Sequence, residues 1–315
     1  MRVHPEWILG AGFFCFGLIF GSFLNVCIYR LPRGLSVVRP RSACPACHTP
    51  IAAYDNIPIL SWLMLGGRCR HCHVRITPRY AAVELLCGLL FLFSFLQAGL
   101  SANAVKGCVL CFLLLGLAFT DAETHLLPDA MTLPGLAVAL LFSFFSLVPG
   151  PAYRFFPLHF HQALTVRQID IQLGWRSLVN SLLGAAIGSG ILYGIAWVYL
   201  KLRKVEGMGL GDVKLMAMAG AFLGPALTIF VLCTSSLLGG ACGIFILLAV
   251  FRKRLVRYRA RFRAQAASRA WQAAQSAMQN VEIPFGVFLC VMSIVAWFYG
   301  APTIRSYLGL FQIPG

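Results

Sequence analysis

The sequence predicts an all-α membrane protein with about eight transmembrane helices. Of its 315 residues, 59% are apolar and 11% are charged, and the mean hydropathy is +0.79. Several segments are therefore long and uncharged enough to cross a bilayer, which takes about 20 apolar residues per helix. Lys and Arg gather in a few polar loops, where basic residues of membrane proteins record topology. We therefore expect no nucleic-acid partner, despite the net charge of +16.

The individual spans follow from the apolar runs and the polar breaks between them. Residues 8–28 form the first, and no small-residue cleavage site follows, so we predict a retained helix. The segment 213–223 is too short to cross alone unless the bilayer is thin or the helix is buried, and Gly224-Pro225 ends it. The remaining spans are predicted at 81–96, 105–120, 129–148, 178–200, 226–251 and 283–299.

The basic residues predict the orientation of these spans. Loops 30–79, 201–204 and 252–269 hold eight, three and eight Lys and Arg residues. Because basic loops stay in the cytoplasm, all three are expected inside and both termini outside. With the spans alternating in direction, three carboxylates, Asp121, Asp129 and Asp212, are expected at the cytoplasmic boundary of the membrane.

Three parts follow from this pattern. Residues 1–29 hold the first transmembrane helix, 30–80 form a cytoplasmic loop with four cysteines, and 81–315 form the main membrane domain. Within that domain, a basic cytoplasmic loop at 252–280 has a helix-forming composition. A solvated linker is favoured there over an amphipathic helix that lies on anionic lipid or binds a partner.

The four loop cysteines have the spacing of a metal site. Cys44-Pro-Ala-Cys47 and Cys69-Arg-His-Cys72 are two CxxC pairs separated by 21 residues. Four thiolates close a tetrahedral Zn²⁺ site with no open position, so we expect structural zinc on Cys44, Cys47, Cys69 and Cys72. A disulfide pair is the alternative, but a cytoplasmic loop is reducing.

Two of the carboxylates suggest catalysis. Asp129 follows Pro128 and suits a helix start, whereas Asp121 ends an apolar run, where its charge opposes the helix dipole. Asp212 follows Gly209-Leu-Gly211 and is either a helix N-cap or the partner of Asp121. Two carboxylates at one depth could share a proton, one activating water and the other donating to the scissile carbonyl. The glycines would let backbone approach an extended substrate closely.

Other functions remain open at this point. A proton-coupled transporter could use the same intramembrane acids. A lipid-modifying or scaffold protein with a zinc ribbon is a third possibility, but it would give these acids no functional role. No His-Glu-x-x-His or Gly-x-Ser-x-Gly motif supports a catalytic zinc or a serine nucleophile. A protease needs both carboxylates facing one substrate-sized cavity, so geometry separates these interpretations.

Taken together, the motifs resemble those of bacterial type IV prepilin peptidases, membrane aspartic proteases also called leader peptidase and N-methyltransferase. The resemblance covers almost the whole chain and depends on the order of the motifs more than on any one of them. Besides the two CxxC pairs and Asp121, they are Gly21-Ser-Phe-Leu-Asn-Val26, Tyr29-Arg-Leu-Pro32, Asn56-Ile-Pro58, Ser61-Trp62, Arg79-Tyr80, Leu127-Pro-Asp129, Gly209-Leu-Gly-Asp212-Val-Lys214 and Pro284-Phe-Gly286.

The resemblance implies that Asp121 and Asp212 are the catalytic dyad, with Gly209, Gly211, Lys214 and Asp129 as supporting motif residues. It implies cleavage of the basic leader of prepilins or pseudopilins at the cytoplasmic face of the bacterial inner membrane, just before a hydrophobic stretch. Larger members then methylate the new N-terminus with S-adenosylmethionine, an activity associated with the cysteine loop. That loop is complete here, so both activities are expected, along with contacts to membrane lipid and to pilus or type II secretion machinery.

The chain departs from the family pattern in two loops. Residues 149–176 and 252–279 look longer than the usual connections of such peptidases. Neither loop includes the dyad motifs, so neither changes the expected peptidase activity.

Overall fold

The computed structural model describes residues 5–145, 171–204, 209–259, 265–278, 284–300 and 303. The predicted all-α fold is confirmed: within these ranges, the only β-structure is two isolated bridges. The longer helices are α1 (Pro5–Arg30), α3 (Arg79–Ala98), α4 (Ala102–Thr124), α5 (Asp129–Phe145), α6 (Ile171–Arg203), α7 (Leu210–Leu223), α8 (Pro225–Arg259), α9 (Ala266–Met278) and α10 (Phe285–Val295), which a π-helical turn, η4 (Ala296–Gly300), continues.

Five of these helices, α1, α3, α4, α6 and α8, are long and apolar enough to span a membrane. Helices α5 and α10 are also apolar but shorter. Helix α7 has 14 residues, about 21 Å at 1.5 Å per residue, which is less than the thickness of the hydrocarbon core. Nearly all of its residues from 215 to 223 are buried by neighbouring helices. The short predicted span is therefore tolerated because protein surrounds it.

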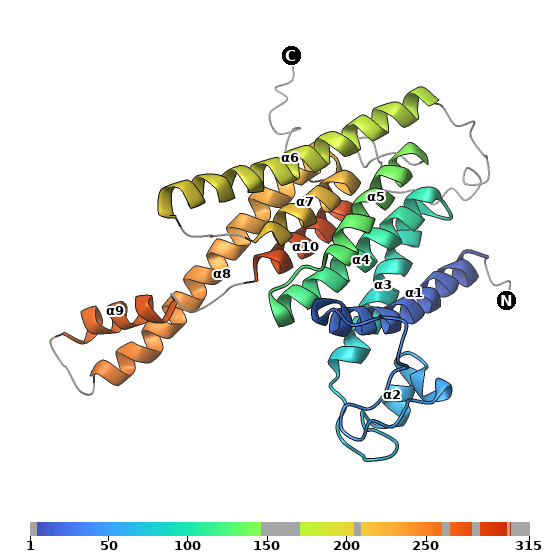
Figure 1. Cartoon of the computed structure of the whole chain (residues 1–315), viewed down its shortest axis with the longest axis horizontal. Helices are drawn as coiled ribbons and strands as arrows, with labels where there is room; N and C mark the ends of the chain where they lie inside the picture. The colour runs from blue at the N-terminus through green and yellow to red at the C-terminus, as the bar shows by residue number, and fades with distance from the viewer. Residues whose placement is uncertain are drawn as a thin grey trace.

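The predicted break after α7 is confirmed. Gly224 caps the helix with φ of +78°, a conformation that suits glycine, and its N–H donates to the carbonyl of Gly220 at 2.8 Å. Pro225 then occupies the first position of α8, where its missing N–H costs nothing. This turn reverses the chain and sets α8 beside the bundle (Figure 1).

Glycines bring several helices unusually close. A Cβ on Gly184 of α6 would collide with the backbone oxygen of Gly220 of α7, and one on Gly220 would collide with Gly184. Similarly, a Cβ on Gly17 of α1 would lie 2.8 Å from the Cα of Gly88 in α3. Small residues at such crossings let membrane helices pack backbone to backbone.

The structure corrects the interpretation of the basic loop after α8. Instead of a solvated linker, α8 continues to Arg259 and α9 folds back along it, so that the pair projects from the bundle as a helical hairpin (Figure 1). Ala270 and Ala274 are fully buried, and the rings of Phe251 and Trp271 meet edge to face at 5.6 Å. Helix α9 therefore packs the alanines of its apolar face against α8, while Trp271 stays 40% exposed.

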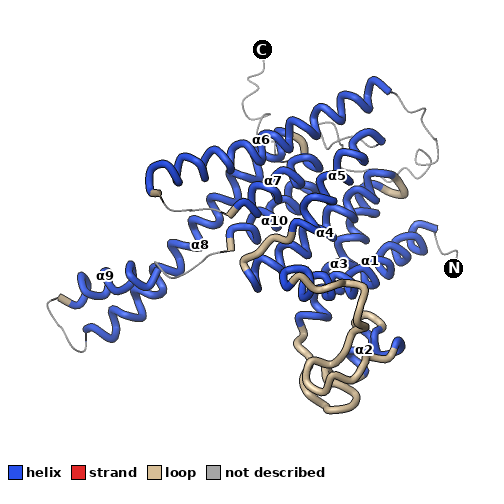
Figure 2. Tube along the Cα trace, viewed as in Figure 1, coloured by secondary structure: helices blue, strands red, loops and turns tan. Residues whose placement is uncertain are grey.

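The cysteine segment between α1 and α3 is built differently. Figure 2 shows that it consists mainly of loop backbone, interrupted by η1 (Leu31–Arg33), η2 (Ala53–Asn56) and the five-residue α2 (Leu60–Met64). The long loop expected at 149–176 lies mostly outside the described residues, as do Glu206, Gly207 and Met208.

Candidate active site and cysteine cluster

Three helix ends that are distant in sequence meet at the two carboxylates. Asp121 lies one turn before the end of α4, Asp212 lies in the first turn of α7, and Gly286 lies in the first turn of α10. Helix α4 extends beyond the predicted end at residue 120, so Asp121 is inside the helix, and it is only 5% exposed. Its backbone carbonyl accepts a hydrogen bond from the N–H of His125 at 2.9 Å.

Both carboxylates face the same point on α10. A Cβ on Gly286 would lie 2.8 Å from Oδ2 of Asp121 and 3.2 Å from Oδ1 of Asp212. The separation of these two carboxylate oxygens is therefore at most the sum of the two distances. The Val287 N–H also donates to Oδ2 of Asp121 at 2.9 Å. Only a residue without a side chain fits between these acids, so the start of α10 completes the site.

The geometry bears on the two interpretations of Asp212. The N-cap of α7 is Gly209, which has no side chain to cap the helix, and Asp212 lies three residues further on. Capping is therefore not its role. The carboxylate instead turns toward Asp121 and Gly286, as the paired interpretation requires.

Asp129 and Lys214 form a separate ion pair beside this site. The Nζ of Lys214 lies 2.7 Å from both carboxylate oxygens of Asp129. The pair ties the first turn of α5 to that of α7, two residues beyond Asp212. A Cβ on Gly211 would lie 3.1 Å from the Cβ of Leu127, so the segment before α5 packs closely across α7. The surroundings of Gly209 are open.

The four predicted cysteine ligands come together in the segment between α1 and α3. All four sulfurs lie within 4.8 Å of one another, with 3.7 Å between Cys44 and Cys72 and 4.0 Å between Cys47 and Cys69. A tetrahedral zinc with bonds of about 2.3 Å requires sulfur separations of roughly 3.8 Å, so the cluster fits this ion. The sulfurs are too far apart for disulfides, whose length is about 2.05 Å.

Two similar turns present these thiols. After each CxxC pair, a histidine adopts a left-handed backbone conformation: His48 with φ of +55° and His73 with φ of +56°. The N–H of each donates back to the carbonyl of the first cysteine of its pair, at 2.9 Å to Cys44 and 3.0 Å to Cys69. The histidines thus shape the turns, and the cluster itself contains only cysteines.

Comparison with known proteins agrees with this geometry. A sequence model described as the bacterial peptidase A24 N-terminal domain matches residues 15–98, and one described as the type IV leader peptidase family matches residues 108–244. The chain belongs to the type IV leader peptidase family. No solved structure matches it significantly.

Curated relatives of this peptidase cover most of its length. The prepilin leader peptidase/N-methyltransferase of Aeromonas hydrophila is 32% identical over 97% of this chain and 96% of its own length. The protein of that name from Myxococcus xanthus (strain DK1622) is 39% identical over 76% of this chain, but the match covers only 63% of the relative. That from Neisseria gonorrhoeae is 35% identical over 71% of this chain and 77% of its own length.

The electrostatics of the peptidase's cysteine cluster favour a bound cation. Hydrogen bonds from the side chain and backbone of Thr49 lower the pKa of Cys47 to about 6, and backbone hydrogen bonds from Cys72 and His71 lower the pKa of Cys69. A backbone hydrogen bond from Val74 also lowers the pKa of Cys72, but desolvation and the neighbouring thiols outweigh it and raise the value to about 11. Touching sulfurs resist holding four negative charges, and Zn²⁺ supplies the compensating charge.

The cysteine segment also lacks an apolar core of its own. Among residues 31–78, all of which are described, the only buried ones are Cys44, Ser61, Gly67 and Cys69. Small segments without a core generally depend on a metal or disulfides for their stability. The donor set, its spacing and the missing core all agree with zinc, which would hold the segment together without taking part in hydrolysis.

Two polar contacts lie where this segment meets the membrane helices. The backbone N–H of Ile59 donates to the buried carboxylate of Glu84 in α3 at 2.7 Å. Just after the segment, Arg79, the first residue of α3, forms an ion pair with Glu123 of α4, two residues after Asp121. Neither contact is evident from the sequence, because each partner is distant along the chain.

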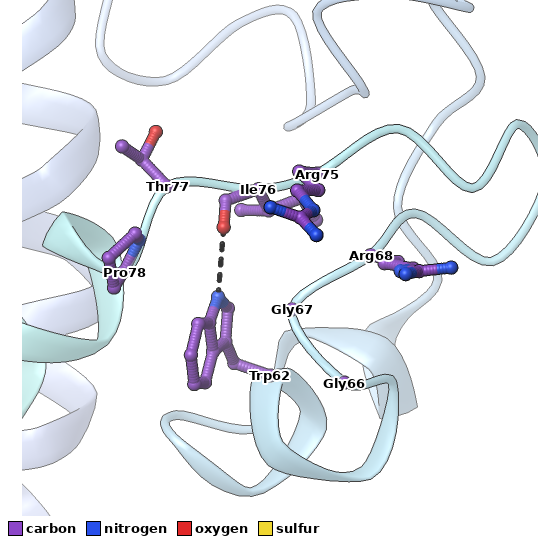
Figure 3. Close-up of a pocket in the computed structure, with 8 residues that line it drawn as sticks. All are labelled: Trp62, Gly66, Gly67, Arg68, Arg75, Ile76, Thr77 and Pro78. Atoms are coloured by element: carbon purple, nitrogen blue, oxygen red, sulfur yellow. Dashed lines mark hydrogen bonds between the residues drawn. The ribbon is translucent and has the colours of Figure 1, made fainter.

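A cavity of about 430 Å³ lies where the cysteine segment leads into α3 (Figure 3). Trp62 lines it and donates its indole N–H to the carbonyl of Ile76 at 3.2 Å. Arg68 and Arg75, which a β-bridge pairs, are also among its lining residues. The volume is within the range of small-molecule sites, about 300–1,000 Å³.

The sequence interpretation missed one part of the site. It included Pro284-Phe-Gly286 among the family motifs but gave Gly286 and Val287 no role. The available signal was a glycine at the start of an apolar span, two residues after Pro284. What it meant depended on the packing of α10 against α4 and α7.

Proposed function

We infer that this chain is an integral-membrane aspartic endopeptidase that removes the leader peptide from prepilins or pseudopilins and then N-methylates the new N-terminus. The observation that carries the peptidase assignment is the convergence of Asp121 and Asp212 on Gly286. Membership of the type IV leader peptidase family and the names of the relatives supply the substrate class and the second activity.

The geometry suggests a division of labour within the dyad. The Val287 N–H points at Asp121, and a hydrogen bond to a carboxylate favours its ionised form. We assign Asp121 as the base that takes a proton from the attacking water and Asp212 as the acid that donates to the scissile carbonyl oxygen. Because the acids exchange one proton during hydrolysis, each is essential.

The proposed location is the bacterial inner membrane, with the dyad at its cytoplasmic boundary. Support comes from the five helices able to span a membrane and from the concentration of Lys and Arg in the cysteine segment and near the ends of α6 and α8. The proposal includes contacts with lipid and with pilus or type II secretion machinery. The α8–α9 hairpin exposes Arg252, Lys253 and Arg257, which suit the acidic surface of either a lipid bilayer or a protein partner.

We assign the methyl donor, S-adenosylmethionine, to the cavity beside Trp62. The indole offers an apolar face for the adenine, and Arg68 and Arg75 complement the donor's carboxylate. The donor would supply the methyl group that the newly exposed amine receives. Zinc on Cys44, Cys47, Cys69 and Cys72 would hold the walls of this cavity, because both arginines flank the second CxxC pair.

The central test combines both activities in one reaction. Purified protein in lipid vesicles is incubated with a prepilin and labelled S-adenosylmethionine, and leader loss and methyl incorporation are followed together. Leader loss should precede methylation, because the amine that receives the methyl group is created by cleavage. Methylation of an uncleaved precursor, or no cleavage of any prepilin or pseudopilin offered, would contradict the proposal.

The methyl-donor site has its own test. A variant with Arg68→Gln and Arg75→Gln should lose at least about tenfold in methyl transfer and require more S-adenosylmethionine for half-maximal rate, since each charge-assisted bond contributes about 1.5–3 kcal/mol. Leader cleavage should not change. Arg41→Gln, elsewhere in the same segment, is the matched control. Equal losses in the control and in the double variant would indicate a general charge effect and not a binding site.

A further inference from the structure

An apolar groove of about 630 Å³ lies between α8 and α10. Its walls include Leu238, Ala241 and Phe245 from α8, and Val287 and Val291 from α10. All of the described residues that line it are apolar or cysteine. The groove therefore suits an apolar occupant and offers nothing to a polar one.

The groove lies next to the proposed catalytic centre. Val287 lines it with its side chain and, through its backbone N–H, holds Oδ2 of Asp121 at 2.9 Å. The preceding residue, Gly286, is the point on which both carboxylates converge. Residues 287 and 291 are one helical turn apart, so the groove extends from the dyad along the axis of α10, away from the end where that helix begins.

The two walls are held together beside the groove. The hydroxyl of Ser235 in α8 donates to the carbonyl of Phe288 in α10 at 3.2 Å. A Cβ on Gly239 would lie 3.6 Å from the ring of Phe285, an ordinary contact distance. The helices therefore touch along part of their length, and the groove is a preformed hollow with fixed walls.

The mouth of the groove faces away from the bundle. Phe245 is 72% exposed and Val291 is 46% exposed, and the neighbouring Leu237 of α8 is 74% exposed. In a membrane these side chains face lipid, because α8 is among the helices long and apolar enough to span it. An occupant can thus enter sideways from the bilayer without crossing the protein.

We propose that this groove seats the apolar helical segment of the substrate that continues from the scissile bond into the membrane. The inference rests on the proposed peptidase function. A chain cleaved at the dyad and continuing into lipid must satisfy its backbone hydrogen bonds internally, as a helix does. Side chains at i and i+4 of such a helix fit the groove between two helices. A lipid acyl chain also matches its apolar lining, but only the substrate is connected to the reacting bond.

Crosslinking tests occupancy directly. A photoreactive phenylalanine analogue is placed at Phe245 or Val291 in the Asp212→Asn background, so that uncleaved precursor accumulates on the protein in lipid vesicles. Both positions should crosslink to the apolar segment of the precursor. The same analogue at Leu237, an exposed position that does not line the groove, is the control and should crosslink only to lipid. Lipid adducts alone at all three positions would overturn the proposal.

Kinetics test whether occupancy contributes to substrate recognition. Ala241→Trp should fill the groove and raise KM for the full-length precursor at least tenfold, with kcat little changed. Leu237→Trp, which introduces the same side chain outside the groove lining, should change neither constant. A precursor peptide that ends shortly after the scissile bond should be cleaved equally by Ala241→Trp and the wild-type protein. Equal losses on both substrates would mean a distorted dyad and would overturn the proposal, as would an unchanged KM.

These outcomes distinguish a failure of the groove proposal from a failure of the proposed peptidase function. If the wild-type protein cleaves no precursor, the proposed function fails, and the crosslinks then decide the groove independently. If the wild-type protein cleaves both substrates but groove positions never crosslink to precursor, the function stands and the groove proposal is wrong.

Discussion

The carboxylate pair and the cysteine cluster are assembled in opposite ways. Asp121, Asp212 and Gly286 come from three helices distant in sequence, and only the packing of α4, α7 and α10 unites them. The four cysteines all lie within residues 44–72, on two similar turns that bring their sulfurs within 4.8 Å. The carboxylate pair is thus a product of tertiary packing, whereas the cysteine cluster comes from residues close together in the sequence.

Their sources of stability differ in the same way. The dyad lies in a bundle in which residues 215–223 of α7 are nearly all buried and helices cross at glycines such as Gly184 and Gly220. The cysteine segment buries only four of its residues, and segments of this kind generally depend on a metal or on disulfides. The two regions should therefore fail independently, one through packing changes and the other through loss of zinc.

The largest effect is expected at the dyad. Asp121→Asn and Asp212→Asn should each lower leader cleavage by about 10³-fold or more, because a carboxamide can neither accept nor share the catalytic proton. Zinc content should stay unchanged, since the cluster is separate. Asp129→Asn is the matched control on a neighbouring helix start and should retain most of the activity. A folded dyad variant with cleavage within tenfold of wild type would refute the catalytic assignment.

Gly286→Ala tests whether packing at α10 positions the dyad. Its new Cβ would lie 2.8 Å from Oδ2 of Asp121, closer than such atoms approach, so a carboxylate must shift. A displacement of this kind costs about 10²-fold in rate, measured as kcat for leader cleavage. Gly240→Ala is the control, because nothing lies within 4 Å of its Cβ position. Wild-type kcat in Gly286→Ala would show that the close approach has no catalytic importance.

Loss of zinc should affect the other region first. Cys44→Ser is expected to lower the metal content and make residues 31–78 sensitive to limited proteolysis, while the membrane helices stay protected. Methyl transfer should fall at least tenfold and leader cleavage less than that, since the dyad lies outside the segment. Cys15→Ser, an exposed cysteine in α1, is the control. A cleavage loss as large as that of Asp121→Asn would mean that the two regions act as one unit.

A smaller effect is expected from the ion pair beside the dyad. Lys214→Met should slow leader cleavage only severalfold, because Lys214 and Asp129 are both partly exposed and such pairs contribute about 0–1 kcal/mol. Added salt should slow leader cleavage by the wild-type protein more than cleavage by the variant, because only the wild type has an ion pair to screen. In a double-mutant cycle with Asp129→Asn, additive losses would show that the ion pair contributes nothing measurable.

The smallest effect concerns a buried cation within the bundle. Lys106 in α4 is fully buried, and its ammonium has no hydrogen-bond partner among the described residues, although it lies 5.9 Å from the centre of the Phe222 ring. Lys106→Met keeps the volume and removes the charge, so the thermal midpoint should rise by a few degrees with cleavage unchanged. A lower midpoint would show that the charge is compensated within the bundle.

Several features follow from the sequence alone because their causes are local. Apolar runs predict the helices, since length and composition determine what can cross a bilayer. Gly224-Pro225 predicts the end of α7, because glycine tolerates the cap and proline cannot continue the helix. The CxxC spacing predicts the cysteine cluster, because each pair needs only one tight turn. Positions 121 and 212 stand out as carboxylates at the edges of apolar segments.

The remaining features depend on which helices pack together, and sequence periodicity does not encode that choice. Only the structure shows that Gly286 lies between the two carboxylates, that Asp129 pairs with Lys214, and that α9 folds back on α8. The groove beside Val287 likewise exists only because α8 and α10 touch along part of their length. The sequence alone determined the chemical groups and their helices, whereas tertiary packing decided their distances and therefore the site.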